Sequence, residues 1–276
     1  MSAPVVSPEL RSLLRRVKLG RSLDTLPERL ALAGDRGLGH AEFLELVLAD
    51  EVARRDTTSA ERRARVAGLD PTMRFEHWDH EAAVTYDRAT LDELASLRFV
   101  EAGHNALVLG PVGVGKTFLA TALGHAAVRR RHPVHFERAD RMFKRLRAAR
   151  LDNSHEAEVR KLLRVDLLIV DDLCLTALDA TDTAVLYEIV VERHRRAATV
   201  VTSNREPIEW LGLMADPLLA QSAIDRLQSA AYELVLDGES YRRRQRPSPG
   251  TPTTRSTGTP TGPSTVTPPQ RRRRST

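Results

Sequence analysis

The segment that most constrains this chain runs from Gly110 to Thr117 and reads GPVGVGKT. A β-type run, ALVL, precedes it, and an Ala/Leu-rich stretch of helical character, TFLATALGHAA, follows it. Its three glycines let the backbone turn so that successive N–H groups converge at the positive end of a helix, where an anion is stabilised. The segment therefore predicts a strand, a phosphate-binding turn and a helix, in that order, and not a plain glycine turn with an incidental lysine.

The segment also satisfies every position of the pattern G-x-x-x-x-G-K-[ST]. Its lysine is expected to reach the β- and γ-phosphates of a nucleotide, and its threonine hydroxyl to help hold a magnesium ion. The pattern thus predicts binding of a nucleoside triphosphate, most simply ATP with Mg2+. The residues expected to contact the nucleotide are Gly110, Pro111, Val112, Gly113, Val114, Gly115, Lys116, Thr117 and Phe118.

Two later β-type runs end in polar residues. LLIVDD ends in Asp171 and Asp172, and ATVVTS is followed by Asn204. Alone, the first is only a strand leaving the core and the second a turn signal. In a parallel sheet, however, the carboxyl ends of strands meet at one edge, beside the glycine-rich turn. We therefore expect Asp171 to hold Mg2+ through water, Asp172 to orient or deprotonate the attacking water, and Asn204 to sense the γ-phosphate.

Arg226 lies in the helical stretch DPLLAQSAIDRLQ. Two interpretations are open for it. It is either a surface ion-pair residue, or an arginine supplied to the phosphates of a neighbouring subunit. Spacing in the sequence does not choose between them.

The order of elements predicts an α/β fold with a parallel sheet covered on both faces. Short apolar runs at 106–110, 133–136, 167–172, 198–203 and 232–236 alternate with helical stretches. Residues 1–75 look helical, including a helix that stops at Gly34, and are expected to be either a solvated helical region or a DNA- or partner-binding region. Residues 76–245 form the nucleotide-binding domain. Residues 246–276, dominated by Pro, Thr, Ser, Gly and Arg, are expected to be a disordered basic tail.

The formal net charge of +5 is concentrated in the tail. Residues 242–276 hold nine arginines and no acid, so the other 241 residues hold 42 − 9 = 33 basic groups against 37 acids. The tail is either a solvated extension or a contact to DNA. The single cysteine, Cys174, is expected to be a buried small hydrophobe. Because one cysteine cannot form an internal disulfide, the sequence indicates a reducing compartment. With no membrane-length apolar run, the chain is expected to be cytoplasmic, and the histidine spacing suggests no zinc site.

Taken together, these segments resemble the IstB-like ATP-binding proteins. They are GPVGVGKTFLATALG, DLLIVDD, TVVTSNREPIEW, DPLLAQSAIDRL and GESYR, and the similarity extends over roughly residues 20–245. The IstB-like proteins are transposition helper ATPases of bacterial insertion sequences, related to the DnaC helicase loaders within the AAA+ class. The resemblance implies an AAA+ P-loop fold and ATP-dependent assembly of a homo-oligomer on double-stranded DNA, with a transposase as partner.

The same resemblance implies an arginine-finger role in trans for Arg226 and a second phosphate-sensing role for Arg242. It also marks a departure, since the family often has Glu where this chain has Asp172, and the shorter side chain is expected to slow hydrolysis without preventing binding. A second departure is the missing glycine just past the two acids, where this chain reads LCLTALD. The main alternative function is a replicative helicase loader that acts as an ATP-switched binding module. A small-molecule kinase is disfavoured because no arginine-rich lid is recognisable.

Overall fold

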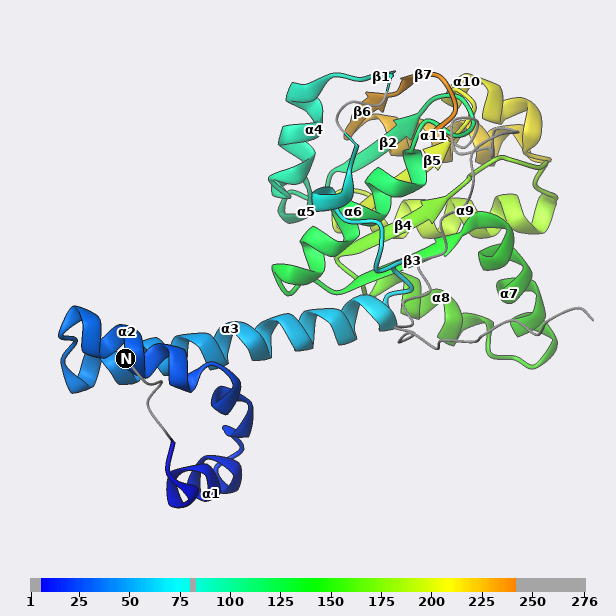
Figure 1. Cartoon of the computed structure of the whole chain (residues 1–276). Coiled ribbons are helices and arrows are strands. Elements are labelled where there is room, and N and C mark those ends of the chain that lie inside the picture. Colours follow the sequence, from blue (N-terminus) through cyan, green and yellow to red (C-terminus); the bar gives the residue numbers. More distant parts are fainter. Residues whose placement is uncertain (1–5, 80–82, 242–276) are drawn as a thin grey trace, which may run out of the picture.

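The computed structural model describes residues 6–79 and 83–241. Five parallel strands form its central sheet in the order β3-β4-β5-β2-β6. This order puts β5 between the strand that leads into the glycine-rich loop and the strand that ends in the acids, as Figure 1 shows. The expected strands are all confirmed, with ends shifted by at most two residues. They are β2 (Asn105–Leu109), β3 (Val134–Arg138), β4 (Leu167–Asp171), β5 (Ala198–Ser203) and β6 (Ala231–Val235).

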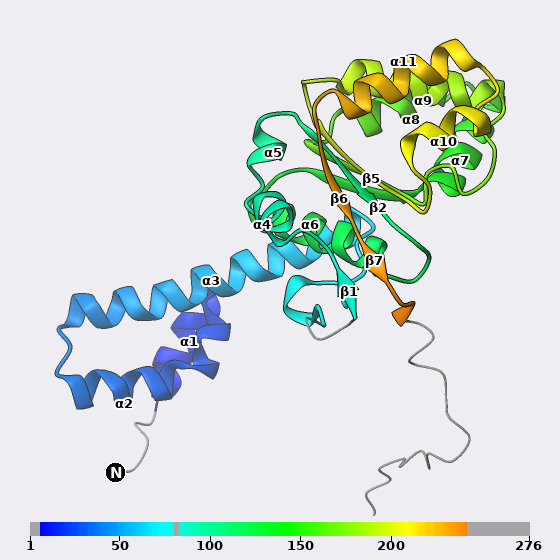
Figure 2. The same cartoon turned by 90° about the horizontal axis from the view of Figure 1, so that it is seen from above.

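Helices cover both faces of the sheet (Figure 2). Because side chains alternate along a strand, β2 sends Leu107 and Leu109 into one core and Ala106 and Val108 into the other. The first core is closed by α7 (Ala139–Leu151), α8 (His155–Leu163), α9 (Ala180–Arg193), α10 (Pro207–Trp210) and α11 (Pro217–Gln228). The second is closed by α4 (Arg88–Ala95), α5 (Arg98–Glu101), α6 (Lys116–Arg129) and the end of α3.

The N-terminal residues form a separate helical module. It consists of α1 (Pro8–Arg16), a 3-10 turn, α2 (Leu26–Arg36) and the first half of α3 (His40–Val66). At about 1.5 Å per residue, the 27 residues of α3 span about 40 Å, and Figure 1 shows this helix reaching from the module to the sheet domain. Its second half packs on α6, where the Arg63 guanidinium donates to the carbonyl of Val128 at 3.0 Å.

The expected helix end at Gly34 is wrong. Gly34 is an interior residue of α2, and the helix ends at Gly37, whose φ of 63° is left-handed. The N–H of Leu38 then bonds to the carbonyl of Ala33 at 3.0 Å, which closes the helix in the manner of a glycine C-cap. Of two nearby glycines, the helix stops at the one that adopts the left-handed conformation.

Two short segments join the ends of the sheet domain. Strand β1 (Val84–Thr85) pairs antiparallel with β7 (Asp237–Gly238). After β7 the chain returns to the glycine-rich loop, where the N–H of Tyr241 donates to the carbonyl of Gly113 at 2.9 Å. Arg242 and the tail at 246–276 lie outside the described residues. Among the residues that the structure describes, none of the helices is long and apolar enough to cross a membrane.

Candidate functional site

The glycine-rich loop lies between the end of β2 and the start of α6, at the carboxyl edge of the sheet. Gly110 has a φ of 139°, and a Cβ there would lie 2.0 Å from the carbonyl oxygen of Leu236. Gly115 has a φ of 101°, and a Cβ there would lie 2.7 Å from the Trp78 ring. The left-handed backbone at both positions and the close backbone approach at Gly110 favour glycine. The loop thus has the backbone that its sequence predicted, with the N-terminal end of a 14-residue helix at its exit.

Lys116 bends back over this loop. Its Nζ donates to the carbonyls of Gly110 and Pro111, each at 2.7 Å. The side chain is therefore already at the mouth of the turn where phosphates are expected.

Thr117 and Asp171 are in direct contact. The threonine hydroxyl donates to Oδ1 of Asp171 at 2.9 Å, and the hydroxyl of Thr202 donates to the same oxygen at 2.6 Å. Asp171 is buried at the end of β4, and its burial raises the pKa of the carboxyl above its usual value. The two hydroxyls and the carboxylate form a compact group of oxygen ligands of the kind that Mg2+ binds.

Asp172 does not belong to β4, which ends at Asp171. It adopts a left-handed conformation with a φ of 58°, and its N–H donates to the Thr202 hydroxyl at 2.9 Å. Aspartate tolerates this region better than most residues. The carboxylate points toward Arg138, whose guanidinium lies 3.9 Å away. The acid is thus held at the edge of the loop's cavity and next to a cation.

A cavity of about 650 Å3 opens in front of the loop, a size typical of small-ligand sites. Lys116, Thr117, Asp172 and Asn204 all line it. Asn204 follows β5, and this strand lies between β4 and β2, so the asparagine faces the loop as its sequence position predicted. The other lining residues of the sheet domain are Val84, Val112, Gly113, Val114, Gly115, Phe118, Arg138, Leu175 and Tyr241.

Arg226 lies near the amino ends of the strands, at the opposite end of the sheet from the glycine-rich loop. Its backbone carbonyl accepts from Nδ2 of Asn105 at 3.5 Å, and Asn105 is the first residue of β2, whereas the loop follows the last. Four strand steps of about 3.3 Å put roughly 13 Å between these ends. The guanidinium donates to the carbonyl of Ser222 at 2.9 Å. Arg226 therefore does not join the cluster around Lys116 within one chain.

Sequence reasoning missed four residues at this site. Thr202 sits inside an apolar run, and only its position at a strand end beside β4 could have indicated its bond to Asp171. Arg138 ends β3 and is brought next to Asp172 by the parallel pairing of β3 with β4. Trp78 and Tyr241 also line the cavity, although both lie far from the loop in the sequence. No local sequence pattern predicts that they belong to the site.

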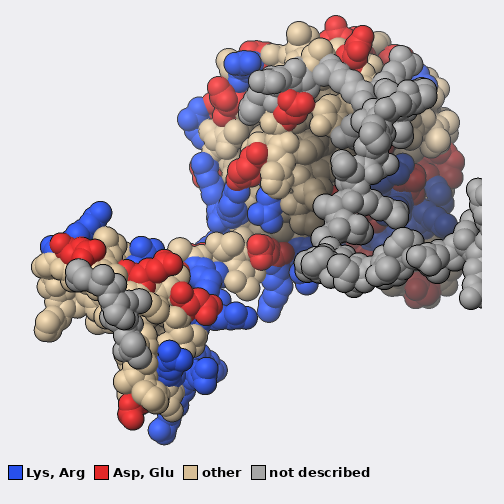
Figure 3. All heavy atoms as spheres, viewed as in Figure 1, with Lys and Arg blue, Asp and Glu red and all other residues tan. Residues whose placement is uncertain are grey.

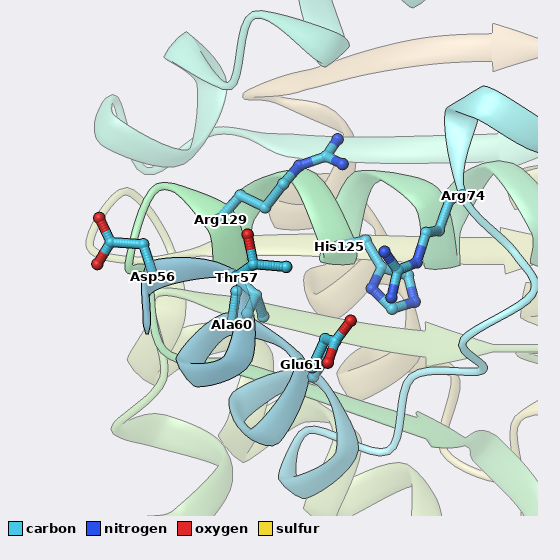
Figure 4. Close-up of a pocket in the computed structure, with 9 residues that line it drawn as sticks. Asp56, Thr57, Ala60, Glu61, Arg74, His125 and Arg129 are labelled. Carbon is cyan, nitrogen blue, oxygen red and sulfur yellow. The ribbon is translucent and has the colours of Figure 1, made fainter. Parts of the chain in front are cut away.

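A second cavity, of about 220 Å3, lies between α3 and α6 and is shown in Figure 4. Charged side chains of both signs border it, and two of them are engaged in ion pairs: Arg129 with Glu76 at 2.7 Å, and Asp56 with Arg131 at 3.0 Å. His125, also on its wall, bonds through Nε2 to the carbonyl of Asp70 at 2.8 Å. These contacts join α3 and the segment after it to α6, so we interpret the cavity as part of the packing between these helices and not as a ligand site.

Proteins of bacterial insertion sequences are similar to this chain over most of its length. A protein of Mycobacterium tuberculosis, named as an ATP-binding protein in an insertion sequence, is 40% identical over 247 residues, which cover 88% of this chain and 97% of the relative. The ATP-binding protein of the insertion sequence IS21 from Pseudomonas aeruginosa is 32% identical over 90% of this chain and 94% of its own length.

Solved structures show the same fold at low sequence identity. The DnaI structure has a TM-score of 0.52 at 21% identity and covers 59% of this chain and 90% of that one. The replication initiator DnaA, bound to AMPPCP and single-stranded DNA, has a TM-score of 0.50 at 20% identity and covers 60% of this chain and 50% of that one. The strand order and these neighbours identify the P-loop fold of the AAA+ class. The family model of the IstB-like ATP binding proteins matches residues 12–248, and the chain belongs to this family.

Proposed function

We propose that this protein is an ATPase that assembles on double-stranded DNA and assists the transposase of an insertion sequence. The observation that carries the proposal is the contact between Thr117 and Asp171 at the mouth of the loop. It brings a phosphate-binding turn and a carboxylate together, which is the minimum needed to hold a nucleotide with its magnesium ion. The relatives named for insertion sequences supply the transposition context.

Each residue of the cluster has a distinct role in this proposal. Lys116 leaves the carbonyls of Gly110 and Pro111 to reach the β- and γ-phosphates, while Thr117 and Asp171 hold Mg2+, the latter partly through water. Asp172 orients or deprotonates the attacking water. Asn204 hydrogen-bonds the γ-phosphate or that water.

Arg226 acts between subunits in this proposal. Because it sits at the far edge of its own sheet, about 13 Å from its own loop by strand length, it can reach phosphates only in a neighbouring copy. An arginine supplied in trans stabilises the charge that develops on the transferred phosphoryl group. Hydrolysis then depends on assembly, so that the nucleotide acts as a switch of a homo-oligomer.

DNA binding is supported by the distribution of cations. The exposed half of α7 carries Arg141, Lys144 and Arg150, and none of the three makes an ion pair with a described acid. The exposed side of α1 carries further basic residues, and Figure 3 shows Lys and Arg on the N-terminal module, interspersed with Asp and Glu. Cations of this kind bind phosphates without sequence preference and release counterions. The arginine-rich tail, outside the described residues, is a further candidate for this contact.

The first test measures ATP binding and hydrolysis with and without duplex DNA. The wild-type protein should bind ATP, hydrolyse it slowly and accelerate on DNA, whereas Lys116→Ala should lose hydrolysis. Asp172→Asn should retain ATP binding and lose turnover. A wild type that binds no nucleotide, or a Lys116→Ala variant with full activity, would refute the proposal.

The second test addresses the trans arrangement by mixing two inactive variants. A Lys116→Ala subunit still offers its Arg226, and an Arg226→Ala subunit still offers an intact loop. An equal mixture should therefore recover part of the activity, while each variant alone and the double variant should stay inactive. Arg88→Ala, an exposed arginine on α4, is the matched control and should behave as wild type. No recovery in the mixture would exclude an arginine finger in trans.

A third test separates transposition from the loading of a replicative helicase. The proposal predicts retention of the protein on duplex DNA with ATP, and capture there of a transposase of an insertion sequence. A preference for single-stranded DNA and binding to a replicative helicase would support the alternative instead. A chain that ends at Gln245 should show a shallower salt dependence if the tail contributes contacts.

A further inference from the structure

One wall of the nucleotide cavity comes from the segment between α3 and β1. The segment that follows α3, residues 67–79, crosses in front of the loop and lines the cavity. It is fastened at two points: the carbonyl of Ala67 accepts from the N–H of Phe136 at 2.8 Å, and that of Asp70 bonds to His125. We call residues 67–79 the connector. Its residues that line the cavity are Thr72, Met73, His77, Trp78 and Asp79.

Trp78 is the part of the connector that touches the loop. A Cβ built on Gly115 would lie 2.7 Å from two carbons of the indole, Cη2 and Cζ3, so the ring rests directly on the backbone of the loop. The ring of Phe118, in the first turn of α6, is 5.3 Å away between centroids and tilted by 51°. The indole Nε1 donates to the hydroxyl of Tyr86 at 3.1 Å.

These contacts hold the indole in place while leaving it half-exposed at the cavity. The phosphates of a nucleotide are expected at the loop, where the backbone N–H groups and the end of α6 attract anions. The rest of the nucleotide must then extend along the cavity past Gly115 and Phe118, toward Trp78. A flat aromatic ring that is already fixed offers a base a stacking partner with little loss of side-chain entropy.

We propose that Trp78 is the base-binding residue of this site and that its indole stacks on the base of the bound nucleotide. The inference rests on the proposed function, because it needs a nucleotide in the cavity. Every base has a π-face, so stacking raises affinity for any nucleoside triphosphate over the bare phosphate chain and does not select one base. It also puts the base in contact with a segment continuous with α3.

The experiment is a calorimetric titration with two probes, MgATP and magnesium tripolyphosphate, which carries the phosphates without a base. Wild type should bind MgATP at least tenfold more tightly than tripolyphosphate. Trp78→Ala should weaken MgATP binding by roughly five- to a hundredfold, the range of base–aromatic stacking, and leave tripolyphosphate binding unchanged. Trp78→Phe keeps a stacking ring and should stay within about threefold of wild type, which separates stacking from general damage to the loop.

Fluorescence gives a second readout, since the chain has two tryptophans and the other, Trp210, is fully buried. ATP should change the emission of wild type and not that of Trp78→Phe. The inference is overturned if Trp78→Ala binds MgATP like wild type, if it loses tripolyphosphate to the same extent, or if the ATP-dependent emission change persists in Trp78→Phe. If the wild-type protein binds neither MgATP nor magnesium tripolyphosphate, and the Lys116→Ala variant behaves in the same way, the proposed function itself is refuted.

Discussion

The Thr117 hydroxyl donates a hydrogen bond of 2.9 Å to Oδ1 of Asp171, a residue 54 positions further along the chain. This one contact joins the first turn of α6 to the end of β4. Thr202, at the end of β5, donates to the same oxygen at 2.6 Å and accepts from the N–H of Asp172 at 2.9 Å. Three elements therefore meet at one carboxylate, and a side chain outside the motifs fixes how both acids are presented.

Replacing Thr202 should impair hydrolysis without preventing nucleotide binding. Thr202→Val keeps the shape but removes the hydroxyl that orients Asp171 and caps the Asp172 N–H, and loss of such a supporting partner typically costs about 10- to 100-fold in metal affinity or activity. We expect kcat to fall and the Mg2+ requirement to rise. Steady-state ATPase kinetics over a magnesium titration measure both, and Thr202→Ser, which keeps the hydroxyl, should restore most of the activity. An unchanged magnesium profile in the valine variant would contradict the assigned role.

The central elements of the fold were predictable because their signals are local. The loop's glycines, its lysine and the apolar runs on either side are contiguous, so spacing alone predicts β2, the turn and α6. The side-by-side placement of Asp171 and Asn204 followed from the rule that parallel strands end at one edge.

What could not be predicted depends on contacts between distant segments. Trp78 reaches Gly115 only because the connector turns back over the loop, a path that tertiary packing sets. The end of α2 was misplaced because two glycines lie three residues apart, and a glycine costs only about 1 kcal/mol inside a helix, too little to force an end at Gly34. The sequence likewise offered no sign that Arg226 lies at the far edge of the sheet from its own loop.

A buried arginine provides a sharp test of the structural core. Arg193 is 2% exposed, and it donates to the carbonyls of Leu162 and Val165 at 2.8 and 2.9 Å and to the Thr199 hydroxyl at 3.1 Å. Burial lowers the pKa of its guanidinium to about 10. Arg193→Ala leaves several buried acceptors unsatisfied, so the free energy of unfolding should fall by at least about 3 kcal/mol.

Urea denaturation measures this loss. Arg196→Ala is the matched control, because Arg196 is exposed and makes only a surface pair with Glu192, so the change there should stay below about 1 kcal/mol. Equal effects of the two substitutions would show that the buried hydrogen bonds of Arg193 add nothing to the free energy of unfolding.

Acid should weaken the ion pairs that Glu137, in β3, makes with Arg145 and His135. Burial raises the pKa of Glu137, but hydrogen bonds from His135 and Arg145 outweigh it and lower the pKa to about 2. A carboxylate with a depressed pKa stabilises the fold above its unfolded value of 4.5, and this contribution disappears as pH falls toward 2. Glu137→Gln should therefore cost on the order of 1–3 kcal/mol at pH 7, and the gap from wild type should narrow below about pH 4.5.

Denaturant titrations between pH 7 and pH 3 follow that gap, with Glu188→Gln, an exposed acid on α9, as control. If the difference in free energy of unfolding between wild type and Glu137→Gln stays constant over this range, the pairing with Arg145 does not lower the pKa of the Glu137 carboxyl.

Cys174 should be chemically silent although it lies close to the acids. Its side chain is 1% exposed, and burial raises the pKa of the thiol to about 12. Because the thiolate is the reactive form, alkylation by iodoacetamide at pH 8 should be about a thousandfold slower than that of an ordinary thiol. Unfolding in guanidinium should abolish the difference. Cys174→Ala should retain ATP hydrolysis within about twofold, since a buried thiol acts as a small hydrophobe. Rapid labelling of the folded protein, or inactivation by the alanine substitution, would instead make this cysteine an accessible participant in the chemistry at Asp172.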